Sequence, residues 1–176
     1  IAPAVHAGEL EPLARDRDSF RLDLAICSHF IGRLPKYMKR HEIAKRTVIC
    51  ERIAAGARLA GVDVDIAVAL GWHESQFNNG AVSKSGRHIG AMQIDPRYHC
   101  PDGKRAGCDI IVAGTDNLAR LIEKYGDDAV AVCHYREGNT CSRSTLRRSK
   151  FVAREAGRAL EWSRFMIDAM TGETED

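Results

Sequence analysis

The sequence predicts a mainly α-helical protein of one domain with a long irregular segment in its middle. Apolar residues recur at helical spacing on both sides of that middle, and residues 78–109 are interrupted by five glycines. The length of 176 residues is enough for one sizeable core. We therefore predict a domain over residues 17–170. A loosely held arm (1–16) precedes it, and a flexible tail (171–176) follows it.

The first half of the chain predicts three helices. The first begins near Ser19 and ends at Gly32, with one apolar face formed by Phe20, Leu24, Cys27 and Ile31. The second covers about residues 42–60 and stops at Gly61. The third is expected to have Asp63 as its N-cap and to continue as a buried helix to Phe77.

The second half predicts a loop followed by three helices. Within residues 78–109 we expect at most a short strand or small hairpin. Thr115 is predicted to cap a helix that ends at Gly126, and Asp127 or Asp128 to open a short helix. A last helix, about residues 149–170, is expected to turn these side chains towards the core: Ala159, Trp162, Phe165, Met166, Ala169 and Met170.

Composition narrows the function classes. Hydrophobic residues make up 44% and charged residues 28%, which is typical of a soluble globular protein. No run of 18 apolar residues is present, so no membrane span is expected. The net charge of +2 does not argue for nucleic acid as a partner. We expect a monomer.

The six cysteines indicate an oxidising compartment. Cys100 and Cys108 are eight residues apart, as are Cys133 and Cys141, and neither pair has the C-x-x-C spacing of metal or redox sites. Fifteen pairings are possible for six cysteines. The preferred one joins each short pair and bridges two helices through Cys27–Cys50. It implies a periplasmic or secreted protein. Zinc bound by cysteine with His99 or His134 stays an alternative, as do reduced buried thiols.

Glu74 is the candidate for chemistry. It follows Leu70 by four residues and Ile66 by eight, and so shares their apolar helix face. A carboxyl group in such surroundings loses hydration, which favours its protonated form and suits a general acid. The alternative is a helix-end carboxylate that faces water or pairs with an arginine. Because W-H-E-S is not H-E-x-x-H, the motif does not indicate a zinc peptidase, and no metal or other cofactor is expected.

The segment ALGWHESQFNNGAVSKSGRHIGAMQI resembles the signature of family 23 glycoside hydrolases. In that family E-S-x-F-N-P and then A-x-S-x-x-G-A-x-G-L-M-Q-I surround one catalytic Glu. Downstream, AVAVCHYREG stands where the family has A-A-Y-N-A-G. The resemblance covers about residues 43–138. It implies a lysozyme-like fold and an enzyme of the group that contains soluble lytic transglycosylases and goose-type lysozymes, both of which act on peptidoglycan.

The resemblance also implies roles for individual residues. Ser83 would hydrogen-bond the substrate or Glu74, and Gln93 would bind sugar from the cleft wall. Met92 is a cleft candidate for which packing is the favoured alternative. Tyr135 would place its hydroxyl near Glu74 and orient it, although it could also be a core tyrosine.

This sequence departs from the family pattern at a few positions. Arg136 and Glu137 replace the usual Asn and Ala, and Asn79 replaces a Pro. Of the arginines that follow Cys141, Arg143, Arg147 and Arg148 are most simply a solvated basic face. They would otherwise meet acidic peptide stems.

The sequence therefore predicts a lytic transglycosylase. Glu74 would protonate the bond between N-acetylmuramic acid and N-acetylglucosamine, and the products would carry 1,6-anhydro ends. One alternative is a goose-type hydrolase, a muramidase or chitinase, in which Asp95 directs a water. In that case Asp95 would be a second catalytic residue; otherwise it caps the turn at Pro96. The other alternative is an inactive glycan-binding module. The expected partners are peptidoglycan strands, with chitin oligosaccharides also open.

Overall fold

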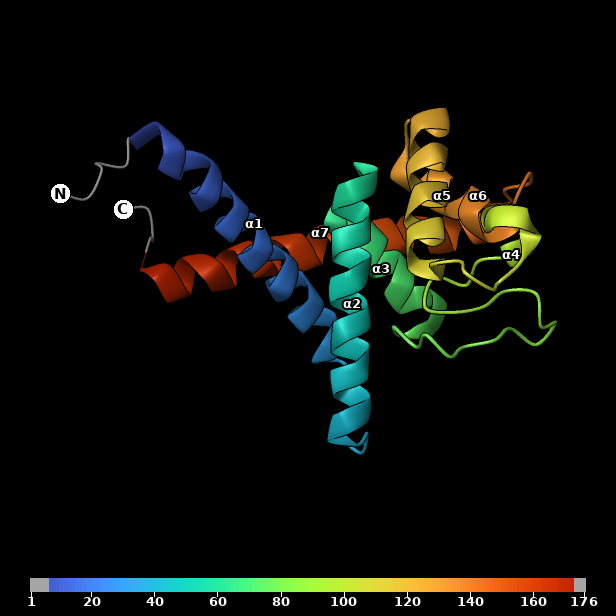
Figure 1. Cartoon of the computed structure of the whole chain (residues 1–176), viewed down its shortest axis with the longest axis horizontal. Coiled ribbons are helices and arrows are strands. Elements are labelled where there is room, and N and C mark those ends of the chain that lie inside the picture. The colour runs from blue at the N-terminus through green and yellow to red at the C-terminus, as the bar shows by residue number, and fades with distance from the viewer. Residues whose placement is uncertain (1–6, 173–176) are drawn as a thin grey trace.

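The protein is mainly α-helical, as predicted. The structure is a computed structural model that describes the backbone of residues 7–172 and the side chains of residues 17–172. Figure 1 shows how its helices cross one another. They are α1 (Ala7–Ile31), α2 (Arg40–Ala60), α3 (Val64–Ser75), α4 (Pro96–His99), η1 (Pro101–Gly103), α5 (Ile110–Tyr125), α6 (Asp128–Glu137) and α7 (Arg143–Thr171).

Helix α3 lies at the centre of the fold because nearly all its side chains are apolar. Residues 66–72 are all buried, and α1, α2 and α7 pack around them. A helix that is apolar on every side is stable only when it is enclosed in this way. Phe30 of α1, Trp72 of α3 and the following Phe77 form an aromatic cluster, with ring centroids 5.8–6.4 Å apart. This cluster fixes the end of α3, where Glu74 lies.

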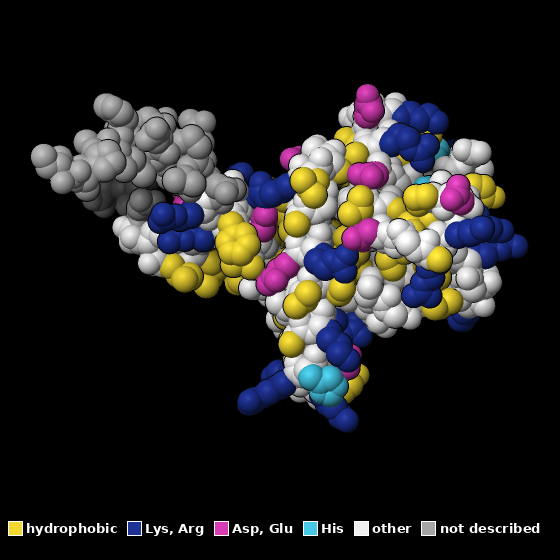
Figure 2. Space-filling view, viewed as in Figure 1, with side chains coloured by type: hydrophobic (Ala, Val, Ile, Leu, Met, Phe, Trp, Pro, Cys, Tyr) yellow, Lys and Arg dark blue, Asp and Glu magenta, His cyan; other side chains and the backbone are white. Residues whose placement is uncertain are grey.

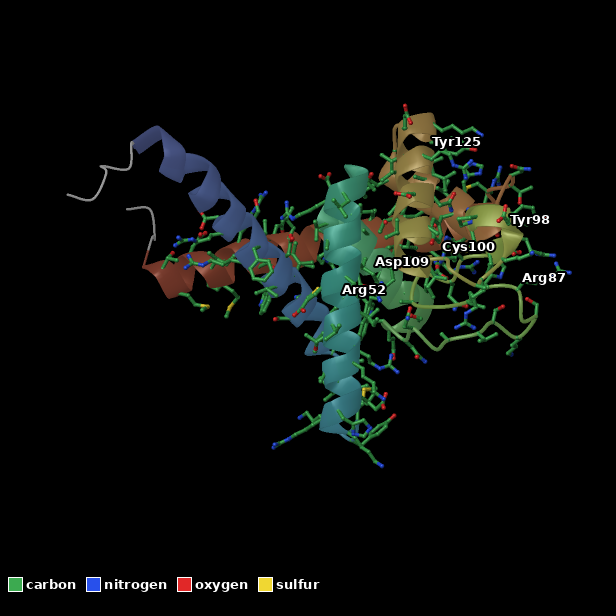
Figure 3. All side chains as sticks on the ribbon, in the orientation of Figure 1. Arg52, Arg87, Tyr98, Cys100, Asp109 and Tyr125 are labelled. Atoms are coloured by element: carbon green, nitrogen blue, oxygen red, sulfur yellow. A yellow bond between two sulfur atoms is a disulfide. The ribbon has the colours of Figure 1, made fainter. Side chains whose placement is uncertain are left out.

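Helix α5 begins earlier than predicted, and Thr115 is not its cap. The N-cap is Asp109, whose carboxylate accepts from the backbone N–H of Ile111 (3.0 Å). Asp109 also accepts from Arg52 of α2 at 2.8 Å, a pair visible in Figure 3. Thr115 is buried in the second turn, where its hydroxyl donates to the carbonyl oxygen of Val112 (3.0 Å). Thr115, predicted as the cap, is therefore a core residue whose hydroxyl is hydrogen-bonded within the helix.

Helices α1 and α7 are both longer than predicted. The arm expected over residues 1–16 is helical from Ala7, because its Ala, Leu, Glu and Arg residues favour a helix without apolar periodicity. Residues 1–6 of that arm and 173–176 of the tail lie outside the described residues. Ser142 caps α7, which begins at Arg143 instead of near Ser149.

The predicted core face of α7 is wrong in the second half of that helix. Ala159 is buried, but Phe165 is 68% and Met170 81% exposed. Figure 1 shows this half extending beyond α2 and α3, so these two helices do not cover the face that carries Phe165 and Met170. The buried positions lie mostly in the first half, at Thr145, Ser149, Val152, Glu155, Ala156, Ala159 and Ser163.

The central loop folds back on itself without a regular hairpin. Two isolated bridges pair Ile89 with Val82 and with Ile94. Gly90 has a φ of 76°, and a Cβ at this position would lie 2.1 Å from Cδ1 of Ile110. Only glycine allows the loop to come this close to α5. The loop is therefore held against the first turn of α5.

Three disulfides join the six cysteines as predicted. Cys27–Cys50 links α1 to α2, Cys100–Cys108 closes the segment around η1, and Cys133–Cys141 ties α6 to the turn before α7.

The positive side chains are not spread evenly over the surface. Figure 2 shows Lys and Arg side chains gathered at the free end of α2, where exposed Lys39, Arg40 and Lys45 lie.

Candidate active site

Glu74 lies in the last turn of α3, and its position depends on how that helix ends. Gln76 and Phe77 both have left-handed backbones (φ 54° and 61°), so α3 ends at Ser75, before the predicted end at Phe77. Arg46 of α2 donates to the carbonyl oxygens of Ser75 (3.3 Å) and Gln76 (2.5 Å). These bonds satisfy carbonyls that the end of a helix leaves without partners. The chain then turns so that Phe77 is fully buried.

Ser75 connects the end of α3 to the central loop. Its hydroxyl donates to the carbonyl oxygen of Ala91 (2.8 Å) and accepts from the backbone N–H of Asn78 (2.9 Å). Glu74 therefore precedes a residue that is hydrogen-bonded on both sides. The arrangement limits the movement of the Glu74 backbone relative to the loop.

A cavity of about 400 Å³ opens beside Glu74. It lies between the end of α3, the central loop, α6 and the first turns of α7. The side chain of Glu74 is 16% exposed, so its carboxylate is largely shielded but reachable. The lining residues are Glu74, Ser83, His88, Gln93, Tyr135, Arg136, Glu137, Thr145 and Arg148. A larger cavity of about 660 Å³ between α2 and residues 77–80 contains none of the predicted site residues.

Ser83 and Gln93 lie in the cavity wall and also hold the loop in shape. The hydroxyl of Ser83 accepts from the backbone N–H of His88 (3.0 Å). The side-chain amide of Gln93 donates to the carbonyl oxygens of Gly90 (2.9 Å) and Ala81 (3.3 Å). The Ser83 hydroxyl also shares a hydrogen bond with the hydroxyl of Ser85. Among the described residues, neither Ser83 nor Gln93 hydrogen-bonds Glu74.

Tyr135 comes from α6 and connects that helix to the loop. Its hydroxyl donates to the carbonyl oxygen of Met92 (2.8 Å) rather than to Glu74. Burial raises the pKa of Tyr135 well above its usual value, and the nearby charge of Glu74 adds to this effect. Tyr135 therefore stays a neutral donor at physiological pH. Met92 is 1% exposed, packs in the core and does not line the cavity.

Arg136 is the residue that contacts the Glu74 carboxylate. Its Nε donates to Oε1 of Glu74 at 2.7 Å, and both side chains are mostly buried. Glu74 is therefore a helix-end carboxylate paired with an arginine, which was the alternative to the purely apolar surroundings that its helix face predicted. Such a charge-assisted bond fixes the orientation of a carboxylate more firmly than a neutral one.

The Asp95 carboxylate is hydrogen-bonded by Arg97. Asp95 caps α4, where its carboxylate accepts from the backbone N–H (3.1 Å) and Nε (2.9 Å) of Arg97. The Arg97 guanidinium lowers the pKa of Asp95 to about 2. Asp95 does not line the cavity that contains Glu74. The structure thus places Asp95 in the turn-capping position before Pro96.

The family comparison agrees with this geometry. A family model for the transglycosylase SLT domain matches residues 51–156, which include all the residues that line the cavity. The chain belongs to the transglycosylase SLT domain family. No curated protein and no solved structure matches the chain. Membership supports lytic transglycosylase-type activity on peptidoglycan in general, and it agrees with the lysozyme-like, helical class that the sequence predicted.

This SLT domain has a second polar network that the sequence did not reveal. Glu137 accepts from the backbone N–H (2.7 Å) and the hydroxyl (2.9 Å) of Ser142, and from the hydroxyl of Thr145. The backbone N–H of Ser142, followed by the Thr145 hydroxyl, lowers the pKa of Glu137. The Cys133–Cys141 disulfide closes the same turn. The wall formed by α6 and α7 is therefore fixed both covalently and by hydrogen bonds.

The signal for this network was present but ambiguous. Ser142 precedes a helix and Glu137 precedes a glycine, which are common cap patterns. Nothing local indicates that the two residues meet. Because all six cysteines of the chain are paired in disulfides, none is a thiolate that binds zinc. None of the helices within residues 7–172 combines the length and the apolar character that a membrane span requires.

Proposed function

We propose that this SLT domain is a lytic transglycosylase that cleaves the β-1,4 bond between N-acetylmuramic acid and N-acetylglucosamine. The observation that carries the proposal is the position of Glu74. It is the carboxylate at the end of the central helix, shielded from most solvent and oriented by a guanidinium, in the wall of a cavity of about 400 Å³. A group that transfers protons needs this combination of access and fixed geometry.

In the proposed reaction, Glu74 in its protonated form gives its proton to the glycosidic oxygen as the bond from that oxygen to C1 of the muramoyl residue breaks. The carboxylate then accepts the proton of the muramoyl 6-hydroxyl while its oxygen forms a bond to C1. The product is a 1,6-anhydro end, and Glu74 is protonated again. No water is consumed, and no second carboxylate is needed.

Arg136 is proposed as a positioning residue. Its contact with Oε1 fixes the Glu74 carboxyl plane, so that the other oxygen is free to face the glycosidic bond. Tyr135 acts one step further away. By holding the Met92 carbonyl, it fixes the loop that carries Gln93 and the opposite wall of the cavity.

The position of Asp95 supports anhydro products over hydrolysis. An inverting hydrolase needs a second carboxylate about 6.5–9.5 Å from the acid, with a water between them. Asp95 is instead occupied by Arg97 and lies outside the cavity lining. Glu137 does line the cavity, but its oxygens are taken up by Ser142 and Thr145.

The test is the cleavage of purified peptidoglycan by wild type and Glu74→Gln. We expect clearing of cell-wall turbidity by wild type and a rate on the order of 10²–10⁴-fold lower for the variant, with unchanged folding by circular dichroism. Near-normal cleavage by folded Glu74→Gln would contradict the assigned role. Binding of glycan strands without any turnover by wild type would instead indicate a glycan-binding module.

A further inference from the structure

Not all of the charged groups around the cavity form ion pairs. Two acids and two arginines line it, in addition to His88. Arg136 is paired with Glu74 at 2.7 Å. Both oxygens of Glu137 accept hydrogen bonds, one from the backbone N–H of Ser142 and the other from the hydroxyls of Ser142 and Thr145. Arg148 is the arginine of this cavity that has no carboxylate within ion-pair distance among the described residues.

Arg148 is nevertheless held in position. Its Nη2 donates to the hydroxyl of Thr145 at 2.7 Å, one turn earlier on α7. Thr145 is itself 1% exposed and donates to Glu137, so this hydroxyl has a fixed orientation. The remaining N–H groups of Arg148 have no acceptor among the described residues. A guanidinium that is held at one nitrogen and free at the others is prepared to bind an anion.

The glycan backbone of peptidoglycan offers such an anion only through its muramoyl side chain. The sugar rings are uncharged, whereas the lactyl group carries either a peptide stem with free carboxylates or, when the stem is removed, a carboxylate of its own. We propose that Arg148 forms a subsite for a carboxylate of the muramoyl side chain, with the peptide stem as its normal source. The inference rests on the proposed function, because it assigns the charged part of that substrate.

The neighbouring Arg147 offers a matched control. It is the preceding residue of α7 and is exposed, as Arg148 is, but it does not line the cavity and makes no ion pair among the described residues. Arg147→Gln and Arg148→Gln thus remove the same charge from adjacent positions, of which one faces the cavity. Both variants are prepared in the Glu74→Gln background, so that binding is measured without turnover.

Calorimetric titration with three tetrasaccharides tests the proposal: one with native stems, one whose stem carboxylates are amidated, and one stripped of stems so that its lactyl carboxylates are free. We expect Arg148→Gln to weaken binding of the native ligand about ten-fold, the size expected for one charge-assisted contact. Arg147→Gln should change it less than two-fold. All three proteins should bind the amidated ligand with equal affinity.

The stripped ligand distinguishes the source of the carboxylate. A loss for Arg148→Gln with native stems only identifies the stem, and a loss with the stripped ligand identifies the lactyl group. Equal losses with native and amidated ligands, or no loss with any ligand, would overturn the subsite while leaving the proposed function intact. If the parent protein binds no ligand and wild type does not cleave peptidoglycan, the proposed function itself fails.

Discussion

Gly114 offers a sharp test of how α5 supports the site. A Cβ at this position would lie 2.6 Å from Cβ of Met92, 2.9 Å from its Cγ and 3.1 Å from the hydroxyl oxygen of Tyr135. The nearest atom is attached directly to the Met92 backbone, so it cannot move away without the loop. Gly114→Ala should therefore displace the Met92 carbonyl and weaken its hydrogen bond with Tyr135.

The expected cost follows from opposing effects. Alanine in place of a helical glycine stabilises a helix by about 1 kcal/mol. Overpacking costs about 1–3 kcal/mol, and the weakened hydrogen bond adds about 1 kcal/mol. The net loss for Gly114→Ala is about 2 kcal/mol, or a Tm lower by about 4–8 °C for a chain of this size. We also expect the cleavage rate to fall at least about ten-fold, because misplacing positioning groups is costly.

Gly157 in α7 is the matched control. A Cβ there meets nothing within 4 Å, so Gly157→Ala should raise the Tm by about 2–4 °C and leave activity unchanged. Thermal unfolding and wall-clearing rates of both variants give the comparison. A Gly114→Ala protein as stable and as active as Gly157→Ala would refute the close packing of α5, Met92 and Tyr135.

Three further predictions concern the site and its supports. Arg136→Gln should lower kcat about ten-fold with KM within two-fold, because its contact is with Glu74 and not with sugar; Arg136→Lys should restore part of the loss, and a pure KM effect would contradict a positioning role. Asp95→Asn should keep its activity but be less stable than wild type above pH 4. The folded-state pKa of Asp95, about 2, lies below the unfolded value of about 3.9, so its stabilisation is complete above pH 4 and lost as pH falls to 2. A stability difference that persists unchanged at pH 2 would be inconsistent with this linkage. Replacing Cys133 and Cys141 by Ala should lower the free energy of unfolding by about 2.5 kcal/mol and also reduce activity. Replacing Cys100 and Cys108, whose disulfide has the same sequence separation, should lower mainly stability. Equal activity losses in the two variants would argue against a special role for the α6–α7 turn.

The sequence predicted features that depend on local chemistry. The end of α2 at Gly61 follows from the left-handed conformation that glycine allows, and the structure has it there. Asp127 caps α6 because its carboxylate accepts from the backbone N–H of Val130, which has no partner within the first turn of the helix. The cysteine pairs were predictable because two of the three are close in sequence.

The features that escaped prediction depend on tertiary contacts. Helical spacing indicates which residues share a face of α7, but not that its second half extends past the body and leaves Phe165 and Met170 exposed. The pair between Glu74 and Arg136 joins residues 62 positions apart and exists because α3 and α6 both face the same cavity. The sequence identified Arg136 only as a departure from the family pattern. Its contact with the Glu74 carboxylate is evident only from the structure.

The most direct test of the central claim is the mass of the products released from purified peptidoglycan. If Glu74 directs the muramoyl 6-hydroxyl to C1, each new end is an anhydro end, lighter by one water than the corresponding hydrolysis product, and labelled water leaves no label in it. Glu74→Gln should release neither product. Reducing muramic ends that carry the label from water, together with an inactive but folded Asp95→Asn, would contradict the account and identify a hydrolase.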